Sequence, residues 1–129
     1  VRSIRNFMGN NKIISDEDEK KIRAMRLGDK NAILWGLKCT GLHYRINAIA
    51  CAVMYNITDD DIIDSIKELK SETYTSIGTS ASGCAYAALD ILGIEKYAGD
   101  SREVKRYLNC KFDFYKDFVV KAQEMKNKS

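Results

Sequence analysis

The sequence has no proline, a single histidine and no hydrophobic run long enough to cross a bilayer. A membrane-spanning helix needs about 20 consecutive apolar residues. The longest apolar stretch, residues 46–55, is much shorter and is interrupted by Asn47. Low-complexity segments that would mark a linker are also absent. We therefore expect residues 1–129 to form a single domain that does not insert into a membrane.

Motifs for catalysis, metal binding and phosphate binding are missing too. His43 is the one histidine available to a catalytic triad or a zinc site, and no partner is spaced for either role. The aspartates 59–61 lack the alternating ligands, glycine and distal glutamate of a calcium loop. Gly78 and Gly83 are not followed by the lysine of a phosphate loop. We predict a protein that is not an enzyme and has no cofactor or metal.

Neither sign of charge dominates. The 21 basic and 18 acidic residues give a net charge of +3, whereas a basic stripe and a pI above about 9 are typical of nucleic-acid-binding domains. The acidic run 16–19 is followed at once by basic residues at 20, 21, 23 and 26, a pattern typical of a solvated, salt-bridged helix face. We predict no nucleic-acid partner, while an acidic protein or a polyanion stays open.

The four cysteines are an even number and are widely spaced, with 11, 32 and 25 residues between successive members. No Cys-x-x-Cys motif is present, which argues against a redox motif or a zinc ribbon. This pattern favours a framework of two disulfides in an exported protein, made by Cys39, Cys51, Cys84 and Cys110. Four buried free thiols in a cytosolic protein are the alternative.

Two of the three possible disulfide pairings fit the predicted helices. If the helices on either side of Gly41 form an antiparallel hairpin, Cys39 lies near its turn and Cys51 about three turns away. Their Cα atoms would then exceed the reach of a disulfide, about 7 Å. This leaves Cys39–Cys84 with Cys51–Cys110, or Cys39–Cys110 with Cys51–Cys84.

Glycines followed by capping residues divide the chain into helices. Ser15 and Asp29 fit as N-caps, Gly28 suits the end of a helix, and Thr58 is expected to cap another. The fold class is therefore all-α, a compact antiparallel bundle of about six helices. The segment 71–82, rich in Ser, Thr and Gly, stays open between strand and helix. Expected helices cover residues 3–8, 15–27, 29–40, 43–55, 58–69, 81–92 and 100–125.

The C-terminal helix carries the widest apolar stripe. Asp100 and Glu103 form a plausible capping box, and apolar residues then follow a 3–4 spacing as far as Met125. Phe112 and Phe114 widen this face. We expect these aromatics in the core, with two functional alternatives: an apolar ligand cavity between helices, or an exposed aromatic anchor for a protein partner.

Asn56 and Asn127 each begin an Asn-x-Ser/Thr glycosylation pattern, which agrees with secretion. Thr58 supplies the hydroxyl of the first pattern, and it also fits as a helix cap. The chain begins with Val1 rather than methionine, so we expect a preceding segment to have been removed, whether a signal peptide or another stretch.

The chain resembles the anophensin/albicin family of anopheline mosquito salivary proteins. The resemblance lies in its size, its proline-free helical pattern, its four spaced cysteines and the segments 26–29, 35–39 and 49–52. It implies a secreted, non-enzymatic inhibitor of host plasma defence. The implied partners are host plasma proteins, either the convertase of the alternative complement pathway or the contact (kallikrein–kinin) system. The protein is expected to be a monomer.

Two other functions remain open. A small secreted carrier of apolar ligands would need a closed apolar cavity, whereas an inhibitor needs a compact core and a functional outer surface. Insect odorant-binding proteins are the obvious carriers of this size, but the 11 residues between Cys39 and Cys51 depart from their cysteine spacing. The second alternative is a cytosolic helical protein-interaction module with free thiols.

Overall fold

The computed structural model describes residues 5–7 and 12–128 and is mostly helical, which confirms the all-α class. The strands in this part of the chain form two short antiparallel pairs, β1 with β2 and β3 with β4. In chain order the elements are β1 (Arg5–Phe7), β2 (Lys12–Ile14), α1 (Asp16–Arg26), α2 (Lys30–Lys38), α3 (Leu42–Met54), α4 (Asp60–Glu68), the 3₁₀ turn η1 (Leu69–Ser71), β3 (Thr75–Ser76), β4 (Thr79–Ser80), α5 (Ala81–Ile91), α6 (Arg102–Cys110), the 3₁₀ turn η2 (Asp113–Tyr115) and α7 (Lys116–Asn127).

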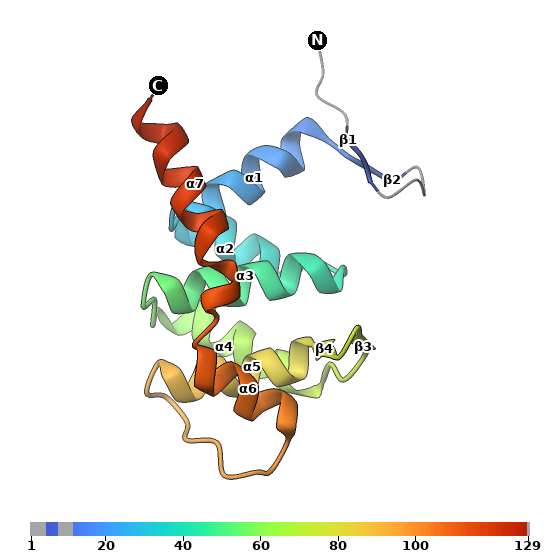
Figure 1. The fold of residues 1–129 in the computed structure, drawn as a ribbon, viewed down its shortest axis with the longest axis vertical. Coiled ribbons are helices and arrows are strands. Elements are labelled where there is room, and N and C mark those ends of the chain that lie inside the picture. The colour runs from blue at the N-terminus through green and yellow to red at the C-terminus, as the bar shows by residue number, and fades with distance from the viewer. Residues whose placement is uncertain (1–4, 8–11, 129) are drawn as a thin grey trace.

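The helices α1 to α6 are stacked along the long axis of the molecule, and α7 runs across the upper helices (Figure 1). Helix α3 is central: six consecutive residues, 47–52, are buried, so every side of the helix is covered. It packs against α2 on one side and α5 on the other. Helix α7 packs on α1 and buries Val119 and Ala122.

Capping residues fix the start of the first two helices as the sequence predicts. The Ser15 hydroxyl accepts the N–H of Asp18 at 3.1 Å, and the Asp29 carboxylate accepts the N–H of Ala32 at 3.1 Å. Gly28 lies between them with a φ of +85°, a conformation that is costly for residues with a Cβ. The acidic first turn of α1 meets the positive end of its helix dipole.

Helix α5 is built from small residues because α6 lies very close to it. A Cβ atom on Gly83 would overlap the carboxylate of Glu103, so only glycine fits there without movement. The segment before α5, which the sequence left open, forms η1 and the hairpin β3–β4. The Ser80 hydroxyl then caps α5 by accepting the N–H of Gly83.

The prediction of one continuous C-terminal helix is wrong. Lys111 and Phe112 both have left-handed φ angles, of 53° and 63°, and they separate α6 from α7. Phe112 is fully buried by this turn and stacks on Tyr107, with ring centroids 5.5 Å apart. In a continuous helix, Phe112 would point about 140° away from Tyr107. Burial of this ring explains the break.

Three local predictions also need correction. Residues 5–7 form a strand rather than part of a helix, and the rest of the expected helix lies outside the described residues. Thr58 does not cap α4, because the helix begins after Asp59. The predicted capping box is replaced by Ser101, whose hydroxyl accepts the N–H of Val104, since Glu103 turns toward the β3–β4 hairpin.

The two predicted disulfides are not found. All four cysteines are free thiols, and no pair lies at bonding distance. Cys39 ends α2 near Asp18 and Arg45, and Cys51 is buried in α3. Cys84 is buried in α5 and is not bonded to Cys110 at the end of α6. An even number of cysteines implies a framework only when helix packing brings the sulfur atoms together, and here buried thiols fill core space as small apolar groups.

Candidate functional sites

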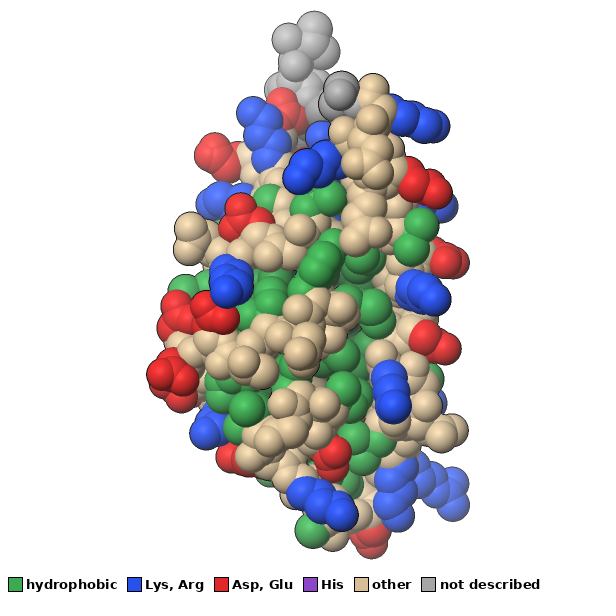
Figure 2. All heavy atoms as spheres, turned by 90° about the vertical axis from the view of Figure 1, so that its left-hand side faces the viewer, with side chains coloured by type: hydrophobic (Ala, Val, Ile, Leu, Met, Phe, Trp, Pro, Cys, Tyr) green, Lys and Arg blue, Asp and Glu red, His purple; other side chains and the backbone are tan. Residues whose placement is uncertain are grey.

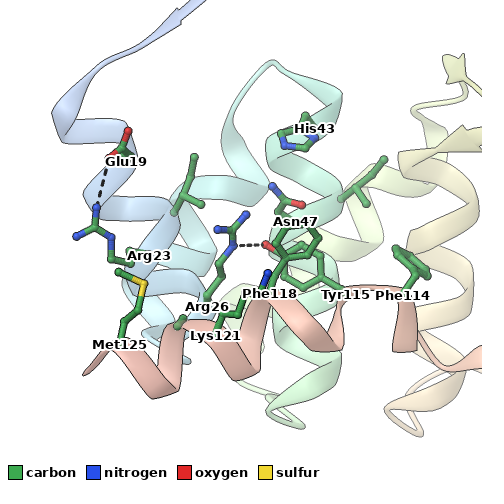
Figure 3. Close-up of a pocket in the computed structure, with 13 residues that line it drawn as sticks. Glu19, Arg23, Arg26, His43, Asn47, Phe114, Tyr115, Phe118, Lys121 and Met125 are labelled. Carbon is green, nitrogen blue, oxygen red and sulfur yellow. Dashed lines mark hydrogen bonds and ion pairs between the residues drawn. The ribbon is translucent and has the colours of Figure 1, made fainter. Parts of the chain in front are cut away.

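A groove of about 630 Å³ lies between α1, α3 and the C-terminal segment from η2 to α7 (Figure 3). Its walls combine apolar surface with charged side chains. The size is within the range of small-molecule sites, about 300–1,000 Å³, but the groove is partly open, so it is not the closed cavity that a carrier was expected to have. Its lining residues are Glu19, Ile22, Arg23, Arg26, His43, Ile46, Asn47, Phe114, Tyr115, Phe118, Lys121, Ala122 and Met125.

Arg26 and Tyr115 fasten the C-terminal segment to α1 at this groove. The Arg26 Nε atom donates to the Tyr115 hydroxyl at 2.9 Å, and the guanidinium lies 4.7 Å from the centroid of the Phe118 ring. A second link joins α7 to the end of α3, because Gln123 donates to the Tyr55 hydroxyl, which in turn donates to the backbone carbonyl of Arg26. Arg26 is thereby held in place at the wall of the groove.

Asn47 is the unusual polar residue of the groove. Its residue exposure is 4%, and its amide nitrogen has no hydrogen-bond partner among the described residues. Figure 3 shows its amide beside the hydrogen bond between Arg26 and Tyr115. A buried donor left without an acceptor costs about 1–3 kcal/mol. The protein therefore keeps an unsatisfied donor at the wall of a groove.

A second candidate site is the β3–β4 hairpin. Ile77 and Gly78 form its two-residue turn with φ angles of +52° and +75°, and type I′ turns require positive values at both positions. Such turns favour Asn, Asp or Gly at the first position, and a β-branched residue there is strained. Ile77 is nevertheless fully exposed, and Tyr74 at the base of the hairpin is 72% exposed.

The hairpin is tied firmly to α6. The Glu103 carboxylate accepts the backbone N–H of Ser80 at 2.6 Å and the Tyr107 hydroxyl at 2.8 Å. Arg106 donates to the carbonyl of Gly78 at 3.2 Å. Ile77 is therefore presented to solvent on an anchored turn and not on a loose loop.

The buried thiols are inert at neutral pH. Burial raises the pKa of Cys51 to about 12, against smaller lowering effects from Arg26 and a hydrogen bond with Tyr115. Burial likewise raises the pKa of Cys84 to about 12. Since the thiolate is the reactive form, neither cysteine is set up as a nucleophile.

Most residues singled out from the sequence stay apart in the structure. His43 is exposed and lines the groove, and Asn56 and Asn127 are exposed at helix ends. Asp59 pairs with Lys30 at 3.0 Å. The sequence showed Asn47 only as a polar interruption of an apolar stretch, and Ile77 was not singled out at all, although its position before Gly78 fits a two-residue turn.

Some site classes are not found in the described part of the chain. No three His, Cys, Asp or Glu side chains there could hold a metal ion together. Within residues 5–7 and 12–128, no helix has the length and apolar character needed to cross a membrane. No family model, curated protein or solved structure matches this chain.

Proposed function

We propose that this chain is a non-enzymatic protein-binding domain that uses Ile77 and Tyr74 as its anchor. The observation that carries the proposal is the turn at Ile77, where a strained apolar residue is kept fully exposed. Neither folding nor packing gains from this side chain. Backbone strain of this kind is a reason to infer function, and exposed aromatic and aliphatic anchors are common at protein interfaces.

The resemblance to mosquito salivary proteins supplies the target class. On this hypothesis the protein is secreted with saliva and inhibits host plasma defence, at the convertase of the alternative complement pathway or in the contact system. The compact core and a surface that carries both apolar and charged side chains agree with a protein that binds its partner through its outer surface. Apolar side chains also gather down the middle of the face opposite the β3–β4 hairpin, with charged side chains around them (Figures 1 and 2). Such patches are typical of interaction surfaces.

Lysis of rabbit erythrocytes by human serum tests this function, with magnesium present and calcium chelated so that only the alternative pathway acts. The proposal predicts dose-dependent protection of the cells by the protein. Full lysis at a large molar excess would rule out the complement target. The contact system would then be tested by kallikrein generation in plasma, and an inactive protein in both assays would overturn the proposal.

The free thiols favour one competing function, a helical protein-interaction module of the cytosol. Reducing compartments keep cysteines in this form, whereas secreted domains of this size often carry disulfides. A count of reactive thiols in the denatured, natively produced protein separates the two locations. Four thiols would favour the cytosolic module, whereas oxidised cysteines would favour an exported protein and contradict the free thiols of the structure.

A further inference from the structure

We propose that the groove between α1, α3 and α7 binds the carboxylate of a long-chain fatty acid, with the Asn47 amide and the Arg26 guanidinium as its head-group site. This binding activity is separate from the hairpin anchor. The groove offers what such a ligand needs: apolar walls, an unsatisfied donor and a surplus of positive charge.

Asn47 supplies the first argument, because its amide nitrogen is buried and has no acceptor among the described residues. Rotation of the Asn47 side chain toward the groove would let an oxygen atom of a ligand there accept from this nitrogen. The ligand would thereby remove a desolvation cost that the empty protein carries. A purely apolar ligand could not do so, which makes an oxygen-bearing head group the fitting occupant.

Charge supplies the second argument. Three cationic side chains, those of Arg23, Arg26 and Lys121, line the groove. The one carboxylate among the lining residues belongs to Glu19, which forms an ion pair with Arg23 at 3.3 Å. Neither Arg26 nor Lys121 has a carboxylate partner within residues 5–7 and 12–128. Arg26 uses only its Nε atom in the hydrogen bond to Tyr115, so its terminal nitrogens can bind an anion. Such charge-assisted hydrogen bonds are stronger than bonds between neutral groups.

The apolar walls supply the third argument. Phe114, Phe118 and Met125 lie along the C-terminal segment and are each about half exposed, so these side chains have room for an apolar partner. Residues 116–125 of α7 span roughly 14 Å at 1.5 Å per residue, and Phe114 in η2 extends this elongated surface, which suits an alkyl chain. The three arguments together favour a ligand with an ionised head group near Asn47 and Arg26 and a hydrocarbon chain along α7.

Isothermal titration with myristate, myristyl alcohol and myristylamine tests the proposal, because the three ligands share one alkyl chain and differ in the head group. We expect myristate to bind most tightly and the amine most weakly. The substitution Asn47→Leu should weaken myristate binding about tenfold or more, and it should weaken binding of the alcohol by less, because a hydroxyl oxygen accepts without charge assistance. Asn109→Leu, the same change at an exposed position of α6, is the matched control and should change nothing.

Several results would overturn this site. They are the absence of saturable myristate binding, equal affinity for all three ligands, and unchanged myristate binding by Asn47→Leu. If Asn47→Leu fails to fold, Lys121→Met on the exposed side of α7 takes its place, and Lys105→Met is its control. Unchanged myristate binding by Lys121→Met would equally contradict the proposal. Ile77→Asn should bind myristate like the unmodified protein, so failure of the hairpin proposal and failure of this one are distinguishable.

Discussion

The Glu103 carboxylate on α6 accepts the backbone N–H of Ser80 at 2.6 Å and so joins the end of the β3–β4 hairpin to the helix packed beneath it. The same carboxylate accepts the hydroxyls of Ser80 and Tyr107. Three donors from two residues, Ser80 at the end of β4 and Tyr107 on α6, therefore depend on one side chain. Its removal affects both the start of α5 and the anchored turn that carries Ile77.

Glu103→Ala should lower the free energy of unfolding by about 2–3 kcal/mol, because part-buried donors lose their acceptor. Glu103→Gln keeps one acceptor oxygen and should cost about half as much. Urea denaturation followed by circular dichroism measures both changes. Equal stability of Glu103→Ala and the unmodified protein would show that these hydrogen bonds contribute nothing.

Gly83→Ala should destabilise the protein by about 1–3 kcal/mol, since the new Cβ overlaps the Glu103 carboxylate. Alanine is the better helix former, so helix propensity alone predicts the opposite sign. In a Glu103→Ala background the obstacle is gone, and Gly83→Ala should become neutral or stabilising. A double-mutant cycle measures this coupling, and additive effects would contradict the close approach of α5 and α6.

Stability should fall as the pH rises above about 9. Burial raises the pKa of Cys51 and Cys84 from 9.0 to about 12, and that of Tyr115 from 10.0 to about 12. Above the unfolded pKa, the unfolded chain releases protons that the folded chain keeps, so alkali favours unfolding. Each group can contribute about 1.4 kcal/mol per pH unit in this window. Urea midpoints that stay constant up to pH 11 would contradict the burial of these groups.

Alkylation should distinguish the four thiols. Iodoacetamide should modify the half-buried Cys39 and Cys110 of the native protein, while Cys51 and Cys84 react only after denaturation. Peptide mass mapping identifies the modified positions. Rapid native modification of Cys84 would show that α5 and α6 do not cover it as described.

The parts of the fold governed by local sequence could be predicted. Ser15, Asp29 and Gly28 mark helix ends through side-chain and backbone preferences that act within a few residues. The break at Lys111 and Phe112 could not be predicted from local sequence, because neither residue favours a left-handed conformation. Only long-range burial of the Phe112 ring explains it. Local pattern therefore located the helices, and tertiary packing decided where the last one is interrupted.

The candidate sites were less accessible to sequence reasoning. Asn47 is visible as a polar residue in an apolar stretch, but its missing acceptor depends on the positions of α1 and α7 around it. Ile77 is informative only once its φ angle and exposure are known. The cysteine count pointed toward disulfides, yet the separation of the sulfur atoms is a property of the helix packing.

The most direct test of the account compares Ile77→Asn with Ile94→Asn in the erythrocyte lysis assay. Asn suits the left-handed turn, so Ile77→Asn should stabilise the fold by about 1 kcal/mol and yet lose protection of the cells. Ile94→Asn removes an exposed isoleucine outside the hairpin and should protect like the unmodified protein. Full protection by a folded Ile77→Asn variant would contradict the hairpin as the partner-binding anchor.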